Sequence, residues 1–139
     1  MAEEITGEAL EKLRTTLSKV PFANLLGIEL AAATHGSVTL RLAIRDDLRQ
    51  IHGVMHGGAI ASLVDTATAF AIVSQLPNAE KFTTVDLTIN YLRPLKDGTV
   101  TAQARVIRAG RRLLTVSAEV VDNDGNLAAM AISTYIRLP

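Results

Sequence analysis

Residues 55 to 72 form an almost wholly apolar segment that carries a single carboxylate, Asp65. Its apolar and small residues fall on every side of a helical wheel, which predicts a helix that is buried all round. The helix is expected to run from about Gly57 to Leu76, where Pro77-Asn78 ends it. Such a helix needs a shell of other elements around it, and burial of an unpaired carboxylate is costly, so Asp65 requires an explanation.

A shorter amphipathic helix is expected over residues 6 to 19, between Thr6 as a possible N-cap and Pro21, which ends the pattern. Its apolar residues recur at helical spacing: Leu10, Leu13, Leu17 and Val20. The following residues, 22 to 27, are expected to form a compact turn.

Most of the remaining chain alternates apolar and polar residues, which is the period of a half-buried strand. The His35-Gly36 pair and the run Asp122-Asn123-Asp124-Gly125 are typical of hairpin turns. These patterns predict strands over residues 28–34, 36–45, 85–91, 100–106, 114–120 and 127–138. The third of these strands is expected to turn its alternate apolar residues to one face: Val85, Leu87, Ile89 and Tyr91.

One long helix and about six strands have a simple packing solution, in which a curved antiparallel sheet wraps the helix. We therefore expect an α+β fold in a single domain, residues 1 to 139, since no repeat or linker divides the chain. Such a sheet has an open edge, and open edges are commonly covered by pairing. A homodimer with a continuous sheet is expected, and with it a tetramer of two dimers.

Fourteen basic residues balance fourteen acidic residues, so no net field would gather nucleic acid or an anionic membrane. The chain has no cysteine, which excludes a disulfide, a thiolate nucleophile and a cysteine metal site. Its N-terminus is acidic where a targeting peptide would be basic, and no apolar run is expected to span a membrane. A cytoplasmic protein is therefore expected.

The motif His56-Gly57-Gly58 lies at the start of the long helix, where the first backbone N–H groups lack partners and the helix dipole favours negative charge. Glycine lets a ligand approach this backbone closely. An ester or thioester carbonyl placed there would be polarised, and an oxyanion formed during attack would be stabilised. The helix start is thus a candidate electrophile site.

Asp65 follows Gly57 by eight residues, which is roughly 12 Å along the helix axis. One helix therefore cannot bring both groups to one carbonyl. Two helices that pack antiparallel across a dimer interface would place Asp65 of one subunit opposite the glycines of the other, in two equivalent sites. There Asp65 would act as a general base on water or would attack the acyl carbon itself.

The spacing of the His56-Gly57-Gly58 motif from Asp65, with six residues between them, resembles the signature of the hotdog-fold acyl-CoA thioesterases of the PaaI type. The flanking segments 22–30, 84–94 and Gly110-Arg111-Arg112 resemble the family pattern in the same order. The resemblance implies a central helix held by a curved sheet, and dimers that are usually paired into tetramers. It also implies hydrolysis of an acyl-CoA thioester at the subunit interface.

By this resemblance Asp65 is the catalytic carboxylate, and the Gly57 amide is the donor that polarises the carbonyl. His56 supports or orients the thioester end, and Thr84 supplies a hydroxyl that helps to hold the water. The alternation of its own strand, however, puts Thr84 on the same polar face as Asp86. The role of Thr84 therefore requires that this face line the interface.

Substrate binding is assigned to Gln50, Gly58 and a set of cations. Related enzymes often carry Asn where this chain has the longer Gln50. Guanidinium groups bind phosphate in a bidentate manner, so basic residues at strand ends are candidates for the CoA phosphates, although each is also typical of a solvated strand end. The candidates are Arg93, Arg111 and Arg112, with Lys96 and Arg108. A neighbouring hotdog group has Glu at the helix carboxylate position, so Asp65 favours the PaaI type.

Plainer roles compete with these assignments. Asp65 would be a structural acid if helix hydroxyls held its carboxylate, the candidates being Ser62, Thr66 and Thr68. His56 would then only cap the helix. His52 and His56 have the spacing of a metal pair, but Gly53 disfavours a helix there and no third ligand is adjacent, so no metal site is expected.

The sequence favours an acyl-CoA thioesterase that hydrolyses a small, medium-chain or aryl thioester to free acid and CoA, with no metal or bound cofactor. A second hypothesis is a hotdog hydratase or dehydratase, which requires a histidine and a carboxylate that act together on the acyl chain. A third is a non-catalytic acyl-CoA binding module, since a fold does not fix a function.

Overall fold

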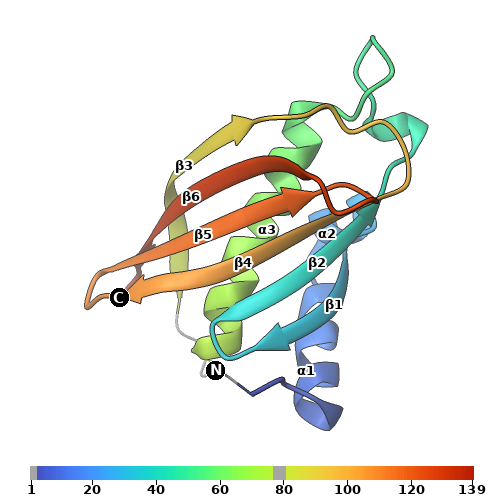
Figure 1. Cartoon of the computed structure of the whole chain (residues 1–139). Coiled ribbons are helices and arrows are strands. Elements are labelled where there is room, and N and C mark those ends of the chain that lie inside the picture. The colour runs from blue at the N-terminus through green and yellow to red at the C-terminus, as the bar shows by residue number, and fades with distance from the viewer. Residues whose placement is uncertain (1–2, 77–80) are drawn as a thin grey trace.

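The computed structural model describes residues 3–76 and 81–139, which form one six-stranded antiparallel sheet wrapped around a long helix (Figure 1). The strand order is β1-β2-β4-β5-β6-β3. The strands are β1 (Glu29–Thr34), β2 (Ser37–Ala43), β3 (Phe82–Tyr91), β4 (Thr99–Ala109), β5 (Leu113–Val121) and β6 (Leu127–Arg137). The helices are α1 (Gly7–Ser18), α2 (Pro21–Leu26), the short 3-10 helix η1 (Asp46–Leu48) and α3 (Gly57–Gln75). The expected α+β hotdog architecture is confirmed, while the predicted Pro77-Asn78 helix stop lies outside the described residues.

The core lies between α3 and the concave face of the sheet. Leu63, Val64 and Ile72 of α3 are fully enclosed and pack with side chains from the inner face of the strands. Each such aliphatic side chain contributes about 1.5–3 kcal/mol on burial. By length and composition alone α3 could cross a membrane, which corrects the expectation that no apolar run reaches that size. The sheet of the same chain packs on its inner face, so α3 is the core helix of this domain.

The face of α3 that points away from the sheet is only partly covered. A stripe of mostly small residues remains accessible along it: Gly58, Ala61, Ser62, Asp65 and Ala69. Each of these positions lies three or four residues from another of the set, so they share one side of the helix. The expectation of burial all round is thus wrong for a single chain, and Asp65 is half-buried rather than enclosed.

A β-bulge interrupts the alternation of β3. Thr84 pairs with Tyr135 and Asp86 pairs with Thr134, so Val85 has no position opposite it on β6. Val85 is 53% exposed, which overturns the expectation that it lies on the apolar face. An extra residue of this kind reverses which face the following side chains point to. Thr84 therefore faces α3 while Asp86 faces solvent, contrary to the strict alternation that groups the two residues.

The segment after Pro21 is a short helix, α2, rather than the expected turn. Pro21 occupies its first turn, and Gly27 ends it in the left-handed conformation with a φ of 81°. The Arg45 guanidinium donates to the carbonyl oxygens of Leu25 and Leu26 at 2.7 and 2.6 Å. Arg45 thus satisfies carbonyls at the end of α2 that the helix leaves without partners.

The two edges of the sheet differ. At the β1 edge, Glu4 forms a bridge with Thr34, and the Ile5 N–H donates to the Ala33 carbonyl at 2.7 Å. The outer edge of β3, a strand of ten residues, pairs with nothing in the part of the chain that the structure describes. A long unpaired edge of this kind is a template for pairing with another chain.

Candidate active site

The Asp65 carboxylate is hydrogen-bonded from the sheet. The Thr84 hydroxyl donates to Asp65 Oδ1 at 2.9 Å, and the Tyr135 hydroxyl lies 3.3 Å from the same oxygen. Thr84 reaches the carboxylate because the bulge at Val85 turns its side chain towards α3. The structure therefore brings together Asp65 and Thr84, which a regular strand would have kept apart.

The hydroxyls on α3 do not hold the carboxylate. Ser62 donates to the Gly58 carbonyl at 2.8 Å, and Thr66 donates to the Ser62 carbonyl at 2.8 Å. Thr68 approaches the main-chain carbonyl of Asp65 at 3.2 Å rather than its side chain. The explanation of Asp65 as an acid held by neighbouring helix hydroxyls is therefore wrong.

Tyr135 on β6 is a residue that sequence reasoning missed. It is 2% exposed, and its hydroxyl lies 2.9 Å from the Asp65 carbonyl and 2.7 Å from Thr68 Oγ1. Burial raises the pKa of Tyr135 to about 12, and the Asp65 charge adds to the effect. A tyrosine near the end of the last predicted strand is the available signal, since a buried phenol needs a polar partner.

His56 caps the N-terminus of α3. Its Nδ1 accepts the Gly58 N–H at 2.8 Å, so in the neutral ring the proton is on Nε2 and points outward. The Gly57 N–H has no acceptor within residues 3–76 and 81–139. It is therefore a free donor at the positive end of a 19-residue helix.

A cleft of about 310 Å³ opens at this end of α3. It is lined by Gln50, Met55, Gly57, Ile60 and residues 91–95. It thus brings together Gln50, Gly57 and Arg93, three of the site residues predicted from the sequence. Tyr91 is not among the predicted site residues, yet its hydroxyl donates to the Gly57 carbonyl at 2.9 Å. A Cβ at position 57 would meet the Tyr91 ring at 3.5 Å, an ordinary contact, so the ring packs directly on the start of the helix.

Gln50 takes part in its own loop as well as in the cleft. Its side-chain oxygen accepts the His52 N–H, and its backbone N–H donates to the Val54 carbonyl at 2.8 Å. This leaves the side-chain amide N–H groups of Gln50 for other acceptors.

The cation candidates lie at two ends of the molecule. Arg93 lines the cleft, just beyond the last residue of β3. Arg112 lies at the opposite end, because its carbonyl accepts the Arg137 N–H at 2.9 Å and Arg137 pairs with Phe82, the first residue of β3. The ten residues of β3 separate these ends by roughly 30 Å. Arg111 and Arg112, in the β4–β5 turn, therefore cannot share the cleft of their own chain (Figure 1).

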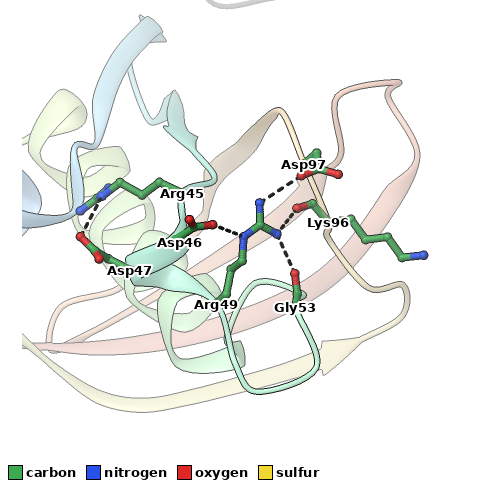
Figure 2. A network of polar contacts seen from close by, with 7 residues as sticks. All are labelled: Arg45, Asp46, Asp47, Arg49, Gly53, Lys96 and Asp97. Atoms are coloured by element: carbon green, nitrogen blue, oxygen red, sulfur yellow. Dashed lines mark hydrogen bonds and ion pairs between the residues drawn. The ribbon is translucent and has the colours of Figure 1, made fainter.

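The Arg49 guanidinium contacts residues of two separate segments, one on its own loop and one at Lys96 and Asp97 (Figure 2). It contacts Asp46 at 3.1 Å, Asp97 at 3.0 Å and the Gly53 carbonyl at 2.6 Å, and it also donates to the Lys96 carbonyl. The hydrogen bond to Asp97 and then that to Asp46 raise the pKa of Arg49 above its usual value. Arg49 thus ties the loop that carries Gln50 to the segment that follows Arg93.

The chain matches the thioesterase superfamily over residues 52–129, a range that includes Asp65, Thr84 and Tyr91. It is 33% identical to a putative esterase, SSO1253, of Saccharolobus solfataricus over 92% of this chain and 85% of that protein. It is 28% identical to the medium/long-chain acyl-CoA thioesterase YigI of Salmonella typhimurium over 98% of this chain and 99% of that protein.

Among solved structures, the fold is similar to that of the Escherichia coli PaaI protein from the phenylacetic acid degradation operon. The TM-score is 0.86 at 26% identity, with 94% of each chain covered. The match extends over the wrapped helix and the sheet that positions Asp65. On these grounds the chain belongs to the thioesterase superfamily and is a thioester hydrolase of the PaaI-type hotdog group.

Proposed function

We propose that this protein is an acyl-CoA thioesterase that hydrolyses small, medium-chain or aryl thioesters to the free acid and CoA. One observation carries the proposal: a half-buried carboxylate, Asp65, is held by Thr84 on the accessible face of a helix whose N-terminus presents a free Gly57 N–H. The relative named as an acyl-CoA thioesterase supports the substrate class. A cytoplasmic location and the absence of a metal or cofactor, both expected from the sequence, are part of the proposal.

We place each active site between two subunits. Gly57 and Asp65 are roughly 12 Å apart along one helix, so a single chain does not present both to one carbonyl. The uncovered stripe of α3 and the free edge of β3 supply two adjacent surfaces for a twofold partner. Antiparallel α3 helices would set Asp65 against Gly57 of the partner subunit, and two such dimers would form the tetramer.

In this site the thioester carbonyl oxygen accepts the Gly57 N–H and is polarised by the helix dipole. His56 Nε2–H lies beside it as an orienting donor. Asp65 takes a proton from a water held with Thr84, and the resulting hydroxide attacks the carbonyl carbon. Collapse of the tetrahedral intermediate breaks the C–S bond, and the CoA thiolate leaves and takes up a proton. Alternatively, Asp65 attacks directly and water then hydrolyses the mixed anhydride.

Arg93 of the cleft is assigned to the CoA phosphates. Arg111 and Arg112 lie at the far end of the sheet from the cleft of their own chain. In the dimer they would reach CoA only at the site whose cleft belongs to the partner subunit. Gln50 and Gly58 flank the thioester end in this arrangement.

A single turnover in ¹⁸O-labelled water tests for direct attack. General-base catalysis puts ¹⁸O into the acid and none into the enzyme. Direct attack followed by addition of water to the Asp65 carbonyl carbon of the mixed anhydride releases an acid that carries an unlabelled oxygen from Asp65, while the label remains on the enzyme, so ¹⁸O in Asp65 identifies this route.

The activity is tested by thiol release from a panel of short, medium, long and aryl CoA esters. We expect one thiol released for each acid formed, with the highest kcat/KM among the small, medium-chain or aryl members. A hydratase or dehydratase would instead interconvert an enoyl chromophore and release no thiol. A binding module would bind the esters tightly without turnover. No thiol release from any member would refute the proposal.

A further inference from the structure

We propose that Tyr135 is a positioning residue that fixes which oxygen of Asp65 takes part in the reaction. The inference rests on the proposed catalytic role of Asp65 and adds a residue to it. Tyr135 lies on β6 opposite Thr84 of β3, so the two hydroxyls approach Asp65 from neighbouring strands. Its ring meets the Phe82 ring edge-on, with centroids 5.5 Å apart and an interplanar angle of 80°. This packing fixes the direction of the phenol.

The Tyr135 hydroxyl has more contacts than burial alone requires. Thr68, which is 0% exposed, lies 2.7 Å away and by itself would satisfy the phenol. When Thr68 donates to Tyr135, the phenol proton is directed at Asp65, whose carbonyl lies at 2.9 Å and whose Oδ1 lies at 3.3 Å. A chain of hydroxyls thus runs from the core of the protein to the carboxylate.

The Tyr135 hydroxyl keeps its proton. Burial raises its pKa, so the phenol keeps its proton at neutral and moderately alkaline pH. The neutral phenol shares its proton between the Asp65 carbonyl oxygen at 2.9 Å and Oδ1 at 3.3 Å, and it does not repel the carboxylate.

The two oxygens of the Asp65 carboxylate differ in their hydrogen-bond donors. Thr84 at 2.9 Å and Tyr135 at 3.3 Å both approach Oδ1. No donor from the described ranges 3–76 and 81–139 reaches Oδ2. Oδ1 is therefore the held oxygen, and Oδ2 is the oxygen left for water or for the thioester carbon. Tyr135 and Thr84 together set the carboxylate plane in which that oxygen is presented.

The test is Tyr135→Phe, which keeps the ring and its packing on Phe82 but removes the hydroxyl. We expect kcat to fall by about tenfold with KM unchanged, since a hydrogen bond to a charged group is lost. Thr68→Val leaves the phenol in place but removes its donor, and a smaller change in the same direction is expected.

Ser74→Ala is the matched control, because it also removes a buried hydroxyl from α3 but lies away from Asp65, where it contacts Gly36 and Ala71. It should lower thermal stability and leave kcat unchanged. The inference is overturned if Tyr135→Phe keeps the wild-type kcat, if it changes only KM, or if Ser74→Ala lowers kcat by as much as Tyr135→Phe does. Full thiol release by Asp65→Asn would instead refute the proposed role of Asp65, so the two failures are distinguishable.

Discussion

Replacement of Asp65 by asparagine should lower kcat for thiol release by about 10²- to 10⁴-fold, the range that a positioned general base contributes. The asparagine side chain has the same size, and its amide oxygen can still accept from Thr84 and Tyr135. It can neither take a proton from water nor attack an acyl carbon. Asp65→Ala should be equally inactive, and both variants should fold and dimerise, as checked by circular dichroism and gel filtration.

Asp86→Asn is the matched control for this experiment. Asp86 is also a carboxylate near the bulge of β3, but it is exposed and its Oδ2 accepts only from Thr88, at 3.3 Å, among the described residues. Its conversion to the amide should leave kcat within a factor of about two, as is usual for a surface position. Activity of Asp65→Asn close to that of Asp86→Asn would contradict the catalytic assignment.

Replacement of Gly57 by proline should lower kcat by about 10²- to 10³-fold, the cost of removing one donor to an oxyanion. Proline removes the Gly57 N–H and puts a methylene in its place, yet it is favoured at the first position of a helix. The preceding residue already suits it, since His56 has a φ of −64° and a ψ of 136°. The variant should therefore keep its helix and its melting temperature while losing thiol release.

Gly57→Ala separates the lost N–H from the added side chain. Its Cβ meets the Tyr91 ring at 3.5 Å, an ordinary contact, and its N–H is retained. This variant should keep most of its activity. Equal losses in the alanine and proline variants would assign the effect to crowding in the cleft rather than to the donor.

The two inactive variants together test whether the site is shared. In a heterodimer of Asp65→Asn and Gly57→Pro chains, a shared arrangement leaves one site with both native groups. Random mixing after denaturation and refolding should then restore about one quarter of the wild-type activity. A site contained within one chain would stay inactive in every mixture, because each chain carries one lesion.

The long elements of the fold could be predicted from the sequence because their signals are periodic. The apolar length of α3 and the alternation in β2, β4, β5 and β6 each require only local residues. The sequence does not predict helix α2, although Pro21 and Gly27 are the residues that commonly open and close a helix. The apolar residues between them show no clear helical period, and this pattern favours a turn.

The site could be predicted only in part. Asp65 and the glycine motif have a fixed spacing on one helix. The approach of Thr84 to Asp65 depends instead on a β-bulge at Val85, and valine is an ordinary strand residue that does not predict a bulge. Tyr135 lies 70 residues from Asp65 in the sequence. The register of β3 on β6 and the fit of α3 against the sheet bring the two together, and neither is local information.

Arg49 couples two segments that lie 48 residues apart in the sequence. Its contacts with Asp46 and Gly53 lie within its own loop, whereas those with Lys96 and Asp97 cross to the segment that follows Arg93. Both segments continue into residues that line the cleft, Gln50 on one side and Arg93 on the other. Loss of the Arg49 guanidinium would therefore release both borders of the cleft from each other, although no residue that lines the cleft would itself be changed.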